Sequence, residues 1–184
     1  MKKTTLAMMI GALAVATSAS ASNWYAQGDL GYAKDKFTSY SDLDESKFEP
    51  RVSVGYDFSD FRLAIDYTHY GKFSGTTNKT DNTSAKIYGI GFSALYDIDI
   101  NTEIKPYVGV RLASNVFKID NNDSGTNFES KTQTKFGYGA VVGGQYKLDS
   151  NWIVNGGIEY NRLGSFNDTK VNNYGAKVGL RYNF

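Results

Sequence analysis

The 184-residue chain has no cysteine, one histidine, and 20 lysines and arginines against 19 aspartates and glutamates. The lack of cysteine excludes a disulfide framework and thiolate chemistry, and a net charge of +1 gives no electrostatic footprint for nucleic acid. A hydrophobic content of 41%, rich in Tyr and Phe, argues against intrinsic disorder. Beyond the N-terminal segment no apolar run approaches the roughly 18 residues of a membrane helix, which excludes an α-helical membrane protein. The polar average with heavy use of Tyr, Gly and Asn fits an all-β chain.

Residues 1–21 are predicted to form a secretory signal peptide. Lys2 and Lys3 provide the positive start, residues 6–16 (LAMMIGALAVA) the apolar stretch, and residues 19–21 the small side chains of a cleavage site. The domain is therefore expected to span residues 22–184. Because no second apolar stretch follows, export should end in the periplasm, outside the cell or in the outer membrane.

The remaining chain alternates between apolar and polar residues with a period of two, which is typical of strands. In the C-terminal run, Val178 and Leu180 share one face, and Lys177 and Arg181 share the other. Eight strands are predicted, at 24–34, 50–58, 61–68, 84–98, 104–112, 132–148, 152–163 and 174–184. Their lengths, mostly about ten to fifteen residues, suit strands that cross a membrane at a tilt.

The two faces of these strands identify their surroundings. The apolar face has aromatic residues at its ends and aliphatic residues between them, as in Phe61, Leu63, Ile65 and Tyr67. This arrangement is typical of a lipid-facing surface with aromatic girdles, and a closed barrel leaves no sheet edge in the lipid. The pattern therefore predicts an eight-stranded antiparallel transmembrane β-barrel rather than a soluble β-sandwich.

The connections between these strands alternate in length. Long polar segments are predicted as external loops at 35–47, 73–83, 119–131 and 164–172, and short periplasmic turns at 59–60, 99–103 and 149–151. A barrel of only eight strands has an interior filled by side chains.

Charged residues on the polar face are predicted to pair with one another inside the barrel, because buried charges must be paired or hydrated. An ion-pair network explains them better than paired catalytic carboxylates or a proton path. The predicted network comprises Arg51, Arg62, Asp66, Lys105, Arg111, Glu159, Lys177 and Arg181.

Five apolar residues lie within the otherwise polar predicted loops. They are Phe37, Tyr40, Leu43, Phe73 and Phe128. Two interpretations remain open: they anchor contacts with a partner, as aromatic residues do at interfaces, or they fold onto the rim of the barrel. The loops carry nearly balanced charge, which disfavours a polyanionic partner.

No catalytic residue, cofactor or metal ion is expected. His69 is the only imidazole and is followed by Tyr70 and Gly71, with no His-x-Ser pairing, so a girdle histidine is the favoured interpretation. Residues 120–125 match the opening of a calcium loop, but its twelfth position is Lys131, where a bidentate glutamate is required.

Four segments carry a family resemblance: PRVSVGY at 50–56, FRLAIDYTHY at 61–70, YGIGFSALYD at 88–97 and KPYVGVRL at 105–112. They resemble the opacity-type porin family, including the small neisserial surface protein A and the opacity (Opa) adhesins. The resemblance implies an eight-stranded barrel in the Gram-negative outer membrane. In the larger opacity relatives it also implies adhesion to host-cell receptors through variable loops, although the loops here look shorter.

These observations predict a surface-binding protein or adhesin that contacts outer-membrane lipid and a host-cell receptor or matrix protein. The alternatives are a narrow porin with weak diffusion activity and an outer-membrane lipid-modifying enzyme. The alternation of Val178, Leu180, Tyr182 and Phe184 resembles the C-terminal signal read by the barrel assembly machinery.

Overall fold

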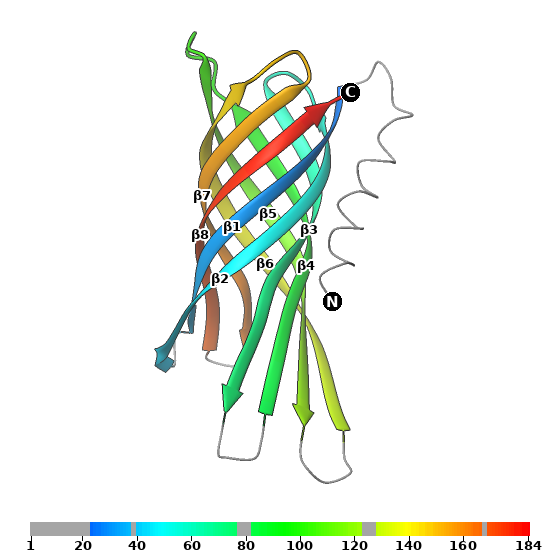
Figure 1. Ribbon diagram of the computed structural model, residues 1–184, viewed down its shortest axis with the longest axis vertical. Helices are drawn as coiled ribbons and strands as arrows, with labels where there is room; N and C mark the ends of the chain where they lie inside the picture. Colours follow the sequence, from blue (N-terminus) through cyan, green and yellow to red (C-terminus); the bar gives the residue numbers. More distant parts are fainter. Residues whose placement is uncertain (1–22, 38–39, 77–81, 123–127, 167–168) are drawn as a thin grey trace.

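The computed structural model describes residues 23–37, 40–76, 82–122, 128–166 and 169–184, with side chains at the ends of the four long hairpins excluded. Its strands are β1 (Trp24–Phe37), β2 (Tyr40–Asp57), β3 (Phe61–Thr76), β4 (Asn82–Asp97), β5 (Ile104–Asn122), β6 (Phe128–Lys147), β7 (Trp152–Phe166) and β8 (Thr169–Asn183). Each pairs with its neighbours in sequence, and β8 closes on β1 (Figure 1). The predicted eight-stranded antiparallel barrel is confirmed. No helix in the described ranges is long and apolar enough to cross a bilayer.

The two ends of the barrel differ. At one end, here called the turn end, residues 58–60, 98–103 and 148–151 connect the strands. The start of β1 and the end of β8 also meet there, where the Phe184 amide donates to the Trp24 carbonyl oxygen at 3.0 Å (Figure 1). At the other, the hairpin end, β3–β4 and β5–β6 project furthest from the barrel (Figure 1).

The predicted long loops were mostly wrong, because strand pairing continues through them. β5 and β6 remain paired as far as Asn122 and Phe128, and β3 and β4 as far as Thr76 and Asn82. Once a strand leaves the membrane, its hydrophobic alternation ends, whereas its backbone groups still gain partners from the adjacent strand. The side-chain pattern therefore marks where lipid contact stops and not where the ladder stops.

Aromatic side chains form two belts around the outside of the barrel. In six strands two of them lie eight residues apart: Trp24 and Tyr32, Phe48 and Tyr56, Tyr88 and Tyr96, Tyr138 and Tyr146, Trp152 and Tyr160, and Tyr174 and Tyr182. Eight residues span about 26 Å of strand, or about 20 Å along the barrel axis at a tilt near 40°. Between the belts, Ile65, Ile90 and Ile158 are more than 60% exposed. This height approaches the roughly 25 Å of the apolar band of an outer-membrane barrel.

Two bulges lie beside apolar side chains that fill the lumen near the hairpin end. The register shifts between His69 and Gly71 on β3, and between Arg162 and Gly164 on β7. The bulged residues Tyr70 and Leu163 are fully buried. They join Ile87, Phe117 and Val171 in an internal apolar cluster that we call the lumen cap.

Candidate functional site: the charged lumen

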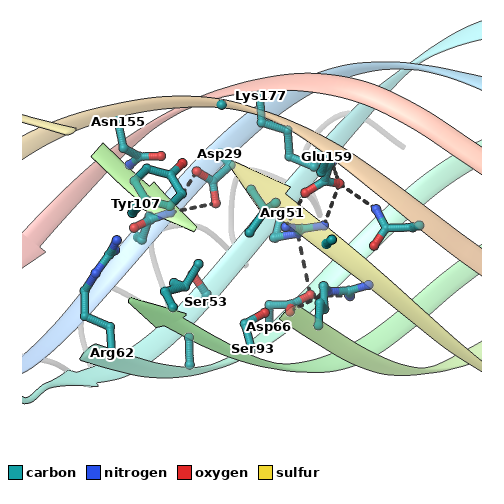
Figure 2. Close-up of a pocket in the computed structure, with 18 of the residues that line it drawn as sticks. Asp29, Arg51, Ser53, Arg62, Asp66, Ser93, Tyr107, Asn155, Glu159 and Lys177 are labelled. Atoms are coloured by element: carbon teal, nitrogen blue, oxygen red, sulfur yellow. Dashed lines mark hydrogen bonds and ion pairs between the residues drawn. The ribbon is translucent and has the colours of Figure 1, made fainter. Parts of the chain in front are cut away.

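The centre of the lumen is organised around Arg51 of β2. Its Nη1 and Nη2 atoms donate to the two carboxylate oxygens of Glu159 at 3.0 and 2.9 Å, in a bidentate pair across the barrel. Its Nε donates to Thr68 Oγ1 at 2.8 Å and lies 3.6 Å from Asp66 Oδ1. Figure 2 shows Arg51 between Asp66 and Glu159, so that one guanidinium ties β2 to both β3 and β7.

Asp66 links this centre to a second arginine. Arg111 donates from Nε and Nη2 to the two Asp66 oxygens at 2.9 and 2.6 Å, and from Nη1 to the Tyr70 hydroxyl at 2.6 Å. Thr68 completes the shell by donating to Asp66 Oδ1 at 2.8 Å. Arg111 therefore joins the ion pairs to the lumen cap.

Lys177 of β8 joins the remaining carboxylates. Its Nζ lies 3.0 Å from Glu49 Oε2 and 3.1 Å from Glu159 Oε1, and Asn173 donates to Glu49 Oε1 at 2.6 Å. The connected network thus balances three cations with three carboxylates: Arg51, Arg111 and Lys177 with Glu49, Asp66 and Glu159. Such balance is what permits these charges to be buried.

Closer to the turn end, a separate pair closes the lumen. Arg62 donates from Nε and Nη2 to the two Asp97 oxygens, both at 2.7 Å, and its guanidinium carbon lies 5.1 Å from the Tyr107 ring centroid. Arg181 is buried nearby and lies 5.1 Å from the Tyr25 ring centroid, with Asp57 at 3.8 Å.

The prediction was wrong for Lys105. Its side chain is 50% exposed and its Nζ lies 3.6 Å from Asp99 of the adjacent turn, outside the connected network. Lys105 has the inward parity, but it is the second residue of β5, where the barrel opens to solvent. The alternation of residues along a strand therefore shows which way a side chain points, but not how deep in the lumen it lies.

Sequence reasoning missed two buried carboxylates. Glu49 and Asp97 are 0% and 9% exposed, and each forms one of the pairs above. Both share the parity of predicted inward residues, Glu49 with Arg51 and Asp97 with Gly91, so the alternation could have identified them. Glu49 was missed because it lies just before the predicted start of its strand.

Inward glycines provide the space for these large side chains. A Cβ on Gly91 would lie 2.5 Å from Arg111 Nε, and a Cβ on Gly143 would lie 2.5 Å from Tyr107 Cζ. A barrel this narrow can hold a bulky residue only where the facing position lacks a side chain. The many glycines on the polar face are therefore part of the network.

Little free space remains inside. The cavity beside Arg51, Asp66 and Glu159 has a volume of about 60 Å³, which is room for only a few water molecules. A wider pocket of about 430 Å³ opens at the turn end, where Arg181 and Asp97 contribute to its lining. In the described part of the chain, no three His, Asp or Glu side chains are grouped to hold a metal ion.

The predicted loop residues lie where side chains are not described. In the backbone, Phe37 ends β1 opposite Tyr40, Leu43 lies in β2, Phe73 in β3 and Phe128 begins β6. Residues 123–127 of the candidate calcium loop and the predicted signal peptide fall outside the described residues. His69 is partly exposed on the outer wall and pairs with Tyr88 in register.

The barrel is closed and eight-stranded, with an apolar outer band, aromatic belts and a charge-balanced interior. These features define an outer-membrane β-barrel protein. The family model described as "Opacity family porin protein" matches residues 54–184. The chain belongs to the opacity porin family, as its sequence motifs predicted, and the Gram-negative outer membrane is its location. In that membrane the turn end is periplasmic and the hairpin end is external.

Relatives and solved structures agree with this assignment. "Protein opa" of Haemophilus influenzae is 53% identical over 131 residues, which are 71% of this chain and all of that protein. Opacity protein V28 of Neisseria gonorrhoeae is 27% identical over 225 positions, covering 87% of this chain and 96% of that protein. The crystal structure of neisserial surface protein A superposes with a TM-score of 0.70 and 32% identity, over 89% of this chain and 98% of that one. The attachment invasion locus protein of Yersinia pestis shares the fold alone, with a TM-score of 0.57, 19% identity and coverage of 87% of this chain and 99% of that one.

Proposed function

We propose that the barrel is a surface-binding protein or adhesin, and that its external hairpin ends contact a host-cell receptor or matrix protein. Export through the signal peptide predicted at residues 1–21 is part of this proposal. Sequencing the N-terminus of the mature protein tests it: Ser22 is expected first, and retention of Met1 would contradict export.

The observation that carries the proposal is the closed lumen. Arg51 spans the centre, and the lumen cap follows it toward the external end. The outer wall between the aromatic belts is committed to lipid, and the interior is committed to its own charges. The hairpin ends are then the surface that remains for a partner outside the cell.

The shape of the external end supports the same function. β5 and β6 stay paired as far as Asn122 and Phe128, ten residues beyond Tyr138 of the aromatic belt. Ten residues of strand extend about 33 Å, or about 25 Å along the barrel axis. A paired hairpin of that length carries Phe128 clear of the bilayer at little entropic cost to a binding event.

The two rival functions have less support. A diffusion porin needs a continuous water column, and the central cavity of about 60 Å³ with a bidentate ion pair across it does not provide one. A lipid-modifying enzyme needs a nucleophile and an orienting carboxylate beside its histidine. In register, His69 lies opposite Tyr88 of β4 instead, and Lys86 is two residues from Tyr88 on β4.

The proposal is tested by removing the apolar groups while keeping the hairpins. Phe37, Tyr40, Leu43, Phe73 and Phe128 are each replaced by Thr, which favours strands but offers no aromatic anchor. A control variant carries Asn82→Thr, Asn121→Thr and Asn122→Thr at the same hairpin ends. Folding is checked by heat modifiability on gels, and adhesion of cells carrying each barrel to epithelial cells and matrix proteins is compared.

Loss of adhesion in the five-residue variant and its retention in the control are expected. If the folded five-residue variant adheres as well as the original, the adhesin function fails. Adhesion should persist at raised salt because the hairpins carry nearly balanced charge. A steep loss with salt would instead indicate a polyanionic partner.

A further inference from the structure

A groove of about 690 Å³ lies on the outer wall of the barrel, over β1, β8, β7 and β6. Its floor includes Ala140 and Ala176, and the rings of Tyr32, Tyr160 and Tyr174 stand around it. In register, Ala176 lies between Tyr32 on one side and Ile158 on the other. Two alanines among large neighbours therefore make a depression in this part of the outer wall.

The walls of this groove are held in place. The rings of Tyr160 and Tyr174 lie 5.0 Å apart between centroids, and the Tyr160 hydroxyl donates to Asn172 Oδ1 at 3.0 Å. A preformed apolar depression on a lipid-facing wall, with small residues at its base, fits an extended acyl chain.

Two cations flank the external end of the groove. Lys34 lines it and pairs in register with Tyr174. Arg162 pairs with Asn172, and its Nη1 donates to the Tyr138 hydroxyl at 3.2 Å. The two cations thus stand on either side of β8, with their Cα atoms about 12 Å apart, because they differ by two strand spacings across the wall and two residues along it. Both side chains are long enough to reach a common anion between them, once Arg162 leaves the Tyr138 hydroxyl on β6.

Other cations lie at this level of the wall. Just beyond the external aromatic belt, the charged residues among the outward side chains that the structure describes are Lys34, Lys86, Lys118 and Arg162. Lys86 and Lys118 lie directly opposite each other in register. At the periplasmic end the exposed charges have both signs, with Lys105 and Lys147 beside Asp60, Asp99, Glu103 and Asp149. The described outward cations at the external end therefore suit an anionic headgroup in the external leaflet.

We propose that this groove binds the phosphorylated glycolipid of the outer leaflet, with an acyl chain over Ala140 and Ala176 and a phosphate between Lys34 and Arg162. An apolar groove that ends in two cations at the membrane boundary matches a molecule with acyl chains and a phosphate headgroup. The site is independent of the adhesin function, because it lies on the lipid-facing wall and not on the hairpin ends.

Binding is measured with the full chain, folded in uncharged detergent micelles, by native mass spectrometry at increasing lipid concentration. The probes are diphosphorylated lipid A, the same lipid without phosphates, and phosphatidylglycerol. Lys34→Gln with Arg162→Gln should weaken lipid A binding about 25-fold, since each cation near a charged surface contributes roughly fivefold. Ala176→Leu should also reduce retention by filling the groove.

Two matched variants serve as controls. Lys86→Gln with Lys118→Gln removes the same charge from the wall outside the groove, and Ala94→Leu enlarges an alanine on the outer face of β4. Both should bind lipid A within about threefold of the original, a shift well below that of the site variants. Equal losses in the two double variants, equal binding of phosphatidylglycerol, or full binding by Ala176→Leu would overturn the proposal.

Discussion

At the scale of single residues, the ion pairs differ in burial and should therefore differ in how much they stabilise the barrel. Asp66 is 4% exposed and accepts from Arg111 through both oxygens, whereas the Lys105–Asp99 pair is at least half exposed and 3.6 Å long. Removing one partner of a buried pair leaves an uncompensated charge, whereas an exposed pair is replaced by water. The two aspartates therefore form a matched comparison.

Replacing Asp66 by Ala should lower the free energy of unfolding by about 3–5 kcal/mol, because Arg111 and Arg51 lose their shared carboxylate. Asp99→Asn, which removes the charge of the exposed pair but keeps the Oδ1 acceptor for the Asn101 amide, should change it by less than about 1 kcal/mol. Urea unfolding of the barrel in lipid vesicles, followed by heat modifiability, measures both. Equal effects of the two substitutions would show that lumen water compensates the buried charges.

The inward glycines lead to a second prediction. A side chain on Gly91 would collide with Arg111, while a Cβ on Gly28 would meet no atom within 4 Å. Gly91→Val should cost about 1–3 kcal/mol of unfolding free energy through overpacking, whereas Gly28→Val should be neutral or stabilising. The same vesicle assay measures the difference. A Gly91→Val barrel as stable as the Gly28→Val barrel would mean that Arg111 can move aside.

At the scale of elements, the three periplasmic turns share one type of side-chain hydrogen bond. In each, an aspartate Oδ1 accepts from the amide two residues ahead: Asp57 from Ser59, Asp99 from Asn101 and Asp149 from Asn151. Such a bond imitates a backbone turn and holds the tight connection without help from packing. Ser59 and Asn101 also have positive φ, at 78° and 54°. The turns were predictable from sequence because their chemistry is local.

Asp149 makes this type of hydrogen bond dependent on pH. Its Oδ1 accepts from the Asn151 and Trp152 amides, both at 2.8 Å, and these bonds lower the pKa of its carboxyl below the usual value. The turn should therefore be strongest when the carboxyl is ionised, and weaken as the pH falls through the lowered pKa. Asp149→Ala should reduce the urea midpoint at neutral pH, and this difference should vanish in acid. Asp149→Asn keeps the acceptor, so an equal loss in that variant would contradict the role of the bond.

The end of β8 carries a prediction about assembly. Val178 and Leu180 are exposed on the outer face, and the rings of Tyr182 and Phe184 lie 5.1 Å apart beside them. We propose that the barrel assembly machinery reads this outward aromatic end, in which case deleting Phe184 should reduce the folded, heat-modifiable band in membranes. Phe184→Tyr, which keeps an aromatic ring at the end of the chain, is the control and should assemble normally. Undiminished assembly of the chain without Phe184 would remove that role.

At the scale of the whole molecule, the barrel and the central ion pairs could be predicted, because lipid on one side and a narrow lumen on the other impose strict alternation. The length of the strands, the depth of a side chain in the lumen and the positions of the bulges could not be predicted. Lys105 has the right parity but lies at the rim, and Tyr70 enters the lumen cap beside a bulge that shifts the register. Hairpin extension depends on backbone pairing that side-chain polarity does not report.

The lumen is closed by three barriers in series, which determines how it should conduct. Arg62 and Asp97 close the periplasmic part, Arg51 and Glu159 the centre, and the lumen cap the external part. In a planar bilayer the original barrel should give only small and intermittent currents compared with a sixteen-stranded porin. Large stable steps would instead favour the diffusion-porin function.

The series arrangement gives a sharper test. Arg62→Ser combined with Asp97→Ser removes one barrier, keeps the net charge and leaves polar groups that water can satisfy. Because the bidentate pair of Arg51 and Glu159 remains across the centre, this variant should conduct no more than the original. The measurement is single-channel recording of both barrels at equal voltage, with folding confirmed by heat modifiability. Large steps in the double variant would mean that the periplasmic pair is the only gate, and that the central arginine yields to a passing ion.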